Sequence, residues 1–502
     1  MFDHLVQGFH ISLSLVNLFY CLVGTTLGTI VGVMPGLGPA ATIALLLPLT
    51  FKMNVTSAII MLSGIYYGVA YGGTITSVLM NIPGEASTVV TCIDGYQMAR
   101  KGRAGPALGI AAFGSFIGST FGILGIMFLA PPLASIAVTF GPAEYTALMV
   151  AGMTLVTYLS SKSVVKSLAM AVLGLVFGCV GLDPITGTER FTFGTLVLLD
   201  GINIAPLAMG LFGLAEVLEI AEESIKQEDL VQGSMNIRNL LPTKKDWKDS
   251  AGPIARGTPL GFFLGILPGG GAVMSSFLSY ALEKRISKHP ERFGTGTIEG
   301  VAGPETANNS GTAGAFIPLL TLGLPFNVIT ALLLAAFMVH GVTPGPLILK
   351  KHPDIFWGVV TSMYIGNVML LILNIPLISI FINILRIPYA ILSSLIAVIC
   401  FVGAFSVNYN AMDVVVMVFF GLVGYLMRKF EYDPAPLMLA YVLGPMLERS
   451  LRQALILSNG SLKIFYREPI AAALLAIAFL SLLTPFFRWT YRSLFRARKE
   501  KG

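Results

Sequence analysis

Long apolar runs constrain this sequence more than any other feature. Residues 110–130, 376–405 and 411–427 carry at most one charged residue each, and each run is close to or above the roughly 20 residues that an α-helix needs to cross a bilayer. Only 12% of the 502 residues are charged and 55% are hydrophobic, whereas an ordinary soluble domain is about 25% charged. We therefore expect an all-α polytopic membrane protein with about ten to twelve membrane segments.

The distribution of charge and of reactive side chains excludes several classes of function. The net charge of +6 does not indicate nucleic-acid binding, because the basic residues gather in short loops and near the C-terminus, as in cytoplasmic parts of membrane proteins. The first Lys or Arg is Lys52, so we expect no cleaved signal peptide. The four cysteines are scattered and are interpreted as buried thiols. The histidines have no metal-ligand spacing, and the sequence holds no P-loop for ATP.

Two apolar segments are interrupted by glycine and proline. Residues 24–38, GTTLGTIVGVMPGLG, match residues 257–271, GTPLGFFLGILPGGG, at Gly, Thr, Leu, Gly, Gly, Pro, Gly and Gly with a constant offset. A weaker pairing follows between residues 71–88 and 309–327. We interpret the two stretches as copies of a duplicated unit.

Equivalent loops of the two copies carry opposite charge. The loop after the first interruption contains only Lys52, while its counterpart, 283–294, is basic; farther on, 99–105 is basic and its counterpart, 340–346, has no Lys or Arg. By the positive-inside rule these loops lie on opposite faces, which predicts the inverted repeat typical of secondary transporters. The predicted regions are a first repeat (1–221), a cytoplasmic linker with an interfacial helix (222–256), a second repeat (257–487) and a basic cytoplasmic tail (488–502).

The interruptions predict a binding site. About eleven apolar residues lie on each side of the second interruption, between basic flanks, and helical arms of that length reach about 16 Å, half the hydrocarbon thickness. We therefore expect each copy to form a broken or re-entrant hairpin with its tip near mid-membrane. Free N–H groups where the returning half-helix begins suit an anion. The alternative is that these glycines serve only close helix packing.

Two sets of candidate residues follow from these motifs. The substrate-binding candidates are the tips and the hydroxyls that follow the first tip: Pro35, Gly36, Leu37, Gly38, Pro39, Thr74, Thr76, Ser87, Pro268, Gly269, Gly270 and Gly271. The cation-binding candidates come from a second, polar broken element in each copy: Asn81, Glu85, Thr306, Asn308, Asn309, Ser310 and Thr312. Their alternative role is helix capping, and for Glu85 and Glu305 a place at the membrane interface.

The two interruptions and the two polar broken elements contain no Lys or Arg, and Arg100 and Arg103 are expected at a cytoplasmic edge. An anionic substrate would therefore be held by helix N-termini, hydroxyls and a co-bound Na⁺ or H⁺, with no other cofactor or metal. Further intramembrane acid candidates, with nothing to tie them to the tips, are Glu144, Glu216 and Asp413.

The motifs closely resemble those of the large membrane subunit of the tripartite tricarboxylate transporters, the TctA family. The matching stretches lie in both halves: GVMPGLGPAATIALLLPLTF, YGGTITSVLMNIPGEAS, DGYQMARKGRAGPALG, GILPGGGA and GPETANNSGTAGAFIPLLTLGLP. The resemblance implies a bacterial inner-membrane protein that takes up citrate-like or other carboxylates with an ion gradient. It also implies a small membrane partner (TctB type) and a periplasmic substrate-binding protein (TctC type).

Three functions were weighed. A cation-coupled carboxylate transporter fits best; a stand-alone channel or exporter of small organic anions is the alternative; an intramembrane enzyme would need a paired nucleophile and base, which the sequence does not offer. For the transporter we predict an elevator rather than a rocking motion, with a static scaffold in the stretches 140–220 and 355–427.

Overall fold

The computed structural model describes residues 2–34, 38–159, 163–183, 185–222, 240–384 and 389–482. The tip residues Pro35, Gly36 and Leu37 and the tail 488–502 lie outside the described residues. Six described helices are long and apolar enough to cross a membrane: Leu15–Val33, Val55–Met80, Ala104–Ala137, Ile204–Glu222, Pro353–Asn374 and Ala411–Lys429. Shorter apolar helices are Pro39–Thr50, Val164–Gly178, Val328–Val339, Ser393–Asn408 and Pro469–Leu482. The expected all-α polytopic membrane protein is confirmed.

The chain forms two compact units. Unit 1 comprises Met1–Ser135 and Asn203–Leu426, and unit 2 comprises Ile136–Ile202 and Met427–Gly502. The elements of unit 1 are α1 (Phe2–Ser12), α2 (Leu15–Val33), α3 (Pro39–Thr50), α4 (Val55–Met80), η1 (Ala86–Thr88), α5 (Val89–Arg100), most of α6 (Ala104–Ala137), α9 (Ile204–Ala208), the π-helix η3 (Met209–Leu214), α10 (Ala215–Glu222), α12 (Lys244–Ile266), α13 (Gly271–Ile286), η4 (Pro290–Arg292), α14 (Glu299–Gly314), α15 (Phe316–Leu322), α16 (Val328–Val339), α17 (Ile348–Lys351), α18 (Pro353–Asn374), α19 (Ile378–Ile384), α20 (Tyr389–Asn408) and α21 (Ala411–Lys429), whose end passes into unit 2.

Unit 1 draws on both halves of the sequence. α4 and α5 pack against α14, α3 packs against α16, and η1 packs against α13. α18 packs against α1, α2 and α4, so the stretch that begins at residue 355, expected in a scaffold, lies in the unit that holds the interruptions. The division into two inverted repeats stays a prediction. The two compact units do not test it, because unit 1 contains elements of both halves of the sequence.

Both first interruptions fall where the sequence predicts them. The last turn of α2 closes with the N–H of Met34 donating to Val31 O (2.9 Å), and that of α12 with the N–H of Leu267 donating to Leu264 O (3.2 Å). Met34 and Leu267 are equivalent positions in the aligned copies, and each precedes the proline that ends the helix. The helices that precede the two breaks therefore end at equivalent residues.

The arms around these interruptions are longer than the predicted eleven residues. α2 and α3 have 19 and 12 residues, and α12 and α13 have 23 and 16. α12 joins the predicted apolar arm, which begins at residue 257, to residues 244–256, which the sequence analysis assigns to the linker and its interfacial helix. A capping box between Thr243 and Asp246 starts this helix, and Asp246 and Arg256 form ion pairs with Arg103 and Glu283.

The second break is predicted correctly in the first half only. There α4 ends at its C-cap Asn81, whose φ is 58°, and helical structure resumes after the N-cap Glu85. In the second half the polar stretch 303–314 lies within the continuous helix α14, and the break follows at Gly323, whose φ is 69°. The polar side chains do not interrupt α14, and its hydroxyls donate to carbonyls within the helix or on a neighbour, as Thr306 does to Ala302 O (2.7 Å).

The two second breaks are nonetheless built alike. Glu85 has φ −146° and ψ 167° and forms a capping box with Thr88. Asn327 has φ −148° and ψ 169° and forms a capping box with Thr330. Each capping box begins the helix that follows the break, and the two boxes lie at corresponding points of the two halves.

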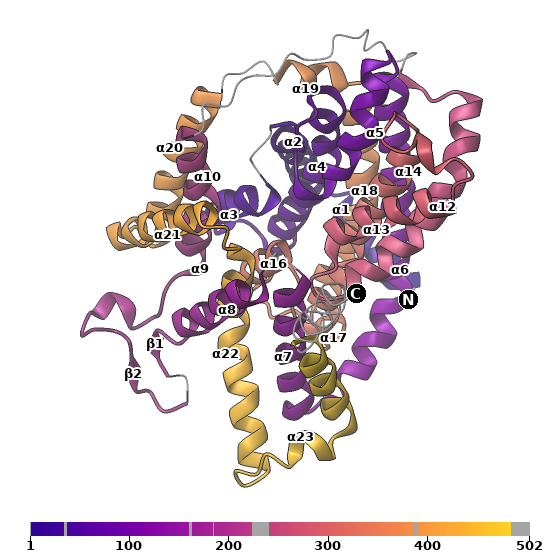
Figure 1. Ribbon diagram of the computed structural model, residues 1–502. Coiled ribbons are helices and arrows are strands. Elements are labelled where there is room, and N and C mark those ends of the chain that lie inside the picture. Colours follow the sequence, from indigo (N-terminus) through magenta and orange to yellow (C-terminus); the bar gives the residue numbers. More distant parts are fainter. Residues whose placement is uncertain are drawn as a thin grey trace, which may run out of the picture. The chain divides into compact units, whose positions relative to one another are not determined.

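Glycine stripes hold the first helices against the second ones. α2 and α4 lie side by side, as do α12 and α14 (Figure 1). A Cβ at Gly28 of α2 would lie 2.5 Å from Ile65 O of α4, and one at Gly261 of α12 would lie 2.1 Å from Ala307 O of α14. Gly28 and Gly261 are equivalent positions, so close helix packing explains a glycine at both of these positions.

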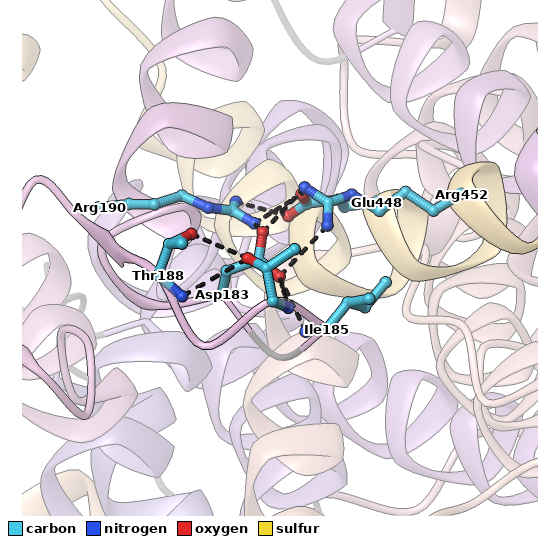
Figure 2. Close-up of polar contacts among 7 residues, drawn as sticks. Asp183, Ile185, Thr188, Arg190, Glu448 and Arg452 are labelled. Atoms are coloured by element: carbon cyan, nitrogen blue, oxygen red, sulfur yellow. Dashed lines mark hydrogen bonds and ion pairs between the residues drawn. The ribbon is translucent and has the colours of Figure 1, made fainter.

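Unit 2 is built around α22 (Pro434–Leu457), which packs against α7 (Pro142–Leu159) and α8 (Val164–Gly178). Its other elements are the antiparallel strands β1 (Gly181–Leu182) and β2 (Glu189–Arg190), η2 (Leu196–Leu198) and α23 (Ile464–Arg467). Two acids and two arginines join the β1–β2 hairpin to α22 (Figure 2). Arg190 and Arg452 both pair with Asp183 and with Glu448, and Arg452 lies 2.9 Å from Asp183 and 2.7 Å from Glu448. 

The carboxylate of Asp183 also accepts backbone hydrogen bonds. The N–H of Thr186 donates to it at 3.0 Å and that of Ile185 at 2.8 Å. These donors, led by the Thr186 N–H, together with the arginines lower the pKa of Asp183 well below its ordinary value. The hairpin is thus fixed to α22 by an ionised carboxylate.

Candidate functional site

Glu305 is the centre of a polar network in unit 1. It lies on α14, and only 1% of its surface is exposed. Its carboxylate accepts a hydrogen bond from Thr74 Oγ1 of α4 (2.8 Å) and another from Thr91 Oγ1 of α5. An acid from the second half is therefore held by two helices of the first half.

A second carboxylate, that of Glu85, belongs to the same network. Glu85 accepts hydrogen bonds from Ser87 Oγ and, at 3.3 Å, from Asn308 Nδ2. Asn308 lies three residues after Glu305, close to one helical turn away on α14. Among the described residues, the hydrogen-bond partners of Glu85 and Glu305 are hydroxyls and amides, and none is a lysine or arginine.

The network continues through side chains that the sequence analysis did not single out. Asn309 Nδ2 donates to Ser115 Oγ of α6 (2.7 Å) and to Glu305 O (3.2 Å). Tyr71 Oη of α4 donates to Asn367 Oδ1 of α18 (2.7 Å). The sequence does contain a signal for Asn367. It is the one Asn, Gln or charged residue between 355 and 373, and a polar side chain isolated in an apolar run often marks a functional site.

The remaining cation-binding candidates differ in their surroundings. Thr306, Ser310 and Thr312 are buried, and their protons are donated to carbonyl oxygens, those of Ser310 and Thr312 to Thr258 O (2.7 Å) and Asn308 O (3.1 Å). Each hydroxyl oxygen keeps lone pairs for a ligand. Asn81 is exposed and ends α4 in the left-handed conformation, which matches its alternative role as a helix cap.

The hydroxyl candidates for substrate binding are also buried. Thr74 donates to Glu305, Thr76 donates to Gly73 O of its own helix (3.1 Å), and Ser87 donates to Glu85. Thr74 and Ser87 therefore contact the two acids, whereas Thr76 bonds within α4.

The described tip residues start the two returning helices. Pro39 is the first residue of α3 after Gly38, and Gly271 is the first residue of α13 after Gly270; neither N-terminus has a side-chain cap. Among the described residues, no atom lies within 4 Å of a Cβ built at Gly38 or Gly271, whereas a Cβ at Gly270 would lie 2.2 Å from Leu264 O. 

The tip of the second hairpin also contacts the second break of its own half. Gly269, next to Pro268, has a φ of 70°, and its N–H donates to Phe326 O (3.2 Å). Among the described residues no hydrogen bond joins this tip to Gly38 or Pro39. Two further acid candidates are held locally, since Glu144 accepts the N–H of Gly141 where α7 begins and Asp413 accepts from Asn408.

Comparison with known proteins decides the family. The model of the family described as "Tripartite tricarboxylate transporter TctA family" matches residues 18–439, a range that contains every network residue named above. The chain belongs to the TctA family. TctA proteins are transporters rather than enzymes, and they act in tripartite systems with other subunits.

Two relatives come from Agrobacterium vitis. The chain is 50% identical to "Uncharacterized 52.8 kDa protein in TAR-I ttuC' 3'region" over 477 residues, which cover 95% of this chain and 94% of the relative. It is 48% identical to "Uncharacterized protein in TAR-II ttuC' 3'region" over 217 residues, which cover 43% of this chain and 90% of the relative. No solved structure matches the chain.

Proposed function

We propose that this TctA protein is the transport subunit of a secondary active, cation-coupled system that takes up tricarboxylates or dicarboxylates. The coupling ion is Na⁺ or H⁺. A periplasmic binding protein delivers the substrate, a small membrane subunit completes the system, and the complex lies in the bacterial inner membrane. The TctA match supports the transport class, and the polar network supports the coupling.

The observation that carries the coupling is the pair of acids without basic partners. Glu305 is buried, and its partners Thr74 and Thr91 are neutral donors. An intramembrane carboxylate is costly unless it is neutralised, and a carboxylate substrate would be repelled by Glu85 and Glu305 in their ionised forms. A bound cation or proton removes both costs, so the cation must bind before or together with the substrate.

The substrate in turn is held at the starts of α3 and α13. Each uncapped helix N-terminus carries free N–H donors and about half a unit of positive charge. Among the described residues, no atom lies within 4 Å of a Cβ at Gly38 or Gly271, and the proposal places the substrate carboxylates beside these two positions. Two such N-termini suit a substrate with more than one carboxylate, and neither requires a lysine or arginine.

The test is uptake in proteoliposomes that contain the chain, its small subunit and its binding protein. Radiolabelled citrate uptake is measured with an inward Na⁺ gradient, with an inward proton gradient and with neither. We expect accumulation with one gradient only and only when the binding protein is present. Equal uptake without gradient and binding protein would favour the stand-alone channel or exporter.

A matched pair of variants tests the acid. Glu305→Gln should lose gradient-driven accumulation, because the charge that the cation neutralises is gone. Glu299→Gln, at the start of the same helix, should retain it. Wild-type accumulation by Glu305→Gln would contradict the proposed coupling role.

A further inference from the structure

An open groove lies in unit 1 where α6, α12 and α14 begin. Its walls are the turn between α5 and α6, the first turns of α12 and the loop that leads into α14. The space open to the centres of water-sized spheres is about 570 Å³, which lies within the roughly 300–1,000 Å³ typical of ligand sites. Four basic side chains line it: Lys101, Arg103, Lys245 and Arg292.

Polar contacts join the three walls of the groove. Arg103 of the α5–α6 turn pairs with Asp246 of α12, and Lys101 Nζ donates to Thr295 O of the loop before α14 (2.5 Å). A Cβ at Gly109 of α6 would lie 1.9 Å from Leu240 O, so the chain ahead of α12 lies directly against α6. The groove is therefore formed by the fold itself, without a ligand.

Three acids also line the groove, and two of them have partners in the protein. Asp246 is paired with Arg103. Glu299 accepts a hydrogen bond from Thr297 Oγ1 and lies in the first turn of α14, where the helix dipole favours an acid. The third acid is Asp249. Four basic and three acidic side chains leave an excess of one positive charge.

Two of the basic side chains have no partner in the described part of the chain. Lys245 and Arg292 are exposed and form no hydrogen bond or ion pair with another described residue. Lys101 uses one of its three N–H donors on Thr295 O. Free arginine and lysine heads in one groove favour a phosphate group. Because the excess is a single positive charge, a phosphodiester with one negative charge fits better than a free di- or trianion.

The groove lies at the level of the lipid headgroups. Pro106, which lines it, belongs to α6, and Ala104–Ala137 is long and apolar enough to cross a membrane. Trp247 of α12 is 36% exposed and packs on Phe113 of α6 with the ring centroids 5.3 Å apart, and tryptophan is enriched at membrane–water interfaces. The basic stretches 99–105 and 283–294 place this interface on the cytoplasmic side by the positive-inside rule.

We propose that this groove binds the headgroup of an anionic phospholipid from the cytoplasmic leaflet. The phosphodiester accepts hydrogen bonds from Lys245 and Arg292, and Lys101 supplies its remaining donors. Basic pockets between membrane helices on the cytoplasmic side suit such headgroups. A lipid bound here ties the start of α12 to the loop that leads into α14, the helix that carries Glu305, whichever cation drives transport.

The test is thermal unfolding of the purified chain in mixed micelles at low ionic strength. Phosphatidylglycerol and phosphatidylcholine are added at equal mole fractions, since a lipid that binds only the folded state raises the unfolding temperature. Phosphatidylglycerol should raise this temperature saturably, and phosphatidylcholine, which has no net charge, should not. Inorganic phosphate and citrate at the same ionic strength test free anions and should have no effect.

Matched variants test the groove residues. Lys245→Gln and Arg292→Gln should each weaken the apparent phosphatidylglycerol affinity by about fivefold, the contribution of one basic side chain near the membrane surface. The controls are Lys248→Gln on α12 and Arg285→Gln at the end of α13, which remove the same charge from the same face outside the groove lining. All four side chains are exposed, so the variants should fold, and the controls should bind phosphatidylglycerol like the wild type.

Three results would overturn the site. No stabilisation by phosphatidylglycerol, or equal stabilisation by phosphatidylcholine, would mean that the groove does not select an anionic lipid. Equal loss of affinity in the groove variants and the controls would show that the basic face attracts the lipid without a defined site. Stabilisation by inorganic phosphate or citrate that Lys245→Gln and Arg292→Gln abolish, without an effect of phosphatidylglycerol, would assign the groove to a free anion instead.

Discussion

Replacing Asp94 should destabilise unit 1 more than any other single loss of an acid outside the membrane network. Asp94 of α5 has no exposed surface. Its carboxylate accepts the N–H groups of Gly294 (3.0 Å), Gly296 (2.7 Å) and Thr297 (2.9 Å) and the hydroxyl of Tyr280 (2.9 Å). These four donors fix the loop that leads into α14, and thereby the helix that carries Glu305.

The magnitude follows from the donors that Asp94→Ala leaves without an acceptor. A buried donor that loses its partner costs about 1–3 kcal/mol. Gly294 is exposed and Gly296 and Thr297 are partly exposed, so water can replace part of the loss. We therefore expect about 4 kcal/mol for Asp94→Ala, at the low end of the sum over four donors, and about 1–2 kcal/mol for Asp94→Asn, which keeps one acceptor oxygen.

The assay is the free energy of unfolding in mixed micelles, measured together with carboxylate uptake. Asp249→Ala, an acid on α12 in the same unit, is the control and should change stability by no more than about 0.5 kcal/mol. If Asp94→Ala unfolds like the Asp249 control, the carboxylate does not hold the loop and the reasoning is refuted.

Three further predictions concern packing, pH and topology. Gly28→Leu and Gly261→Leu should each force two helices apart, which lowers the free energy of unfolding by about 1–3 kcal/mol or prevents folding. The measurement is the yield of folded protein. A similar loss of yield for Gly38→Leu, where no described atom lies within 4 Å of a Cβ, would contradict the packing role of the stripe. Because the folded pKa of Asp183 is lowered, its carboxylate stabilises the fold above the unfolded pKa of about 3.9 and loses this effect as the pH falls toward the folded pKa. Asp183→Asn should therefore flatten the decline in thermal stability below about pH 4, and a parallel decline in both proteins would contradict this. The inverted repeat also predicts which single cysteines react with a membrane-impermeant reagent added from the periplasm. Cysteines at Lys52 and Gly341 should react, and cysteines at Gly102 and Ser287 should be protected. Labelling of all four from one side would refute the inversion.

The positions of the breaks were predictable because their causes are local. Proline lacks an N–H, and the residue before it disfavours helix, so the ends at Met34 and Leu267 follow from the sequence alone. The continuity of α12 from residue 244 was not predicted, although the capping box of Thr243 and Asp246 that starts it is a local signal. The ion pair of Asp246 with Arg103 was not predictable, because it joins residues far apart in the chain. The continuity of α14 was also missed, since a cluster of polar and small residues was interpreted as a break although its hydroxyls are satisfied by nearby carbonyls.

The candidate site was predictable in its residue types rather than in its pairings. Thr74, Glu85 and Asn308 were chosen as polar groups in membrane-like sequence, and the structure places all three in one network. Tyr71 and Asn367 were not chosen, because their hydrogen bond joins residues 296 positions apart. A pairing of that range depends on how the two halves pack, which periodicity and composition do not encode.

That packing bears on how transport occurs. In a rocking mechanism one repeat moves against the other around the site, whereas in the elevator that we propose the hairpin-bearing parts of both repeats move as one body against a static scaffold. The hydrogen bonds from Thr74 to Glu305 and from Asn308 to Glu85 join the halves through the site itself, so rocking would have to break buried polar contacts in every cycle. A disulfide between the halves distinguishes the two. Gly95 of α5 and Val301 of α14 are neighbours across the two halves, since a Cβ at Gly95 would lie 3.6 Å from Val301 Cγ2. The same Cβ would lie 2.9 Å from Val78 Cγ2, so the single variant Gly95→Cys must first be shown to fold. The double variant Gly95→Cys, Val301→Cys should keep gradient-driven uptake when oxidised if the halves move together, with each single variant as the control. Uptake that stops on oxidation and returns on reduction would refute the elevator and favour rocking.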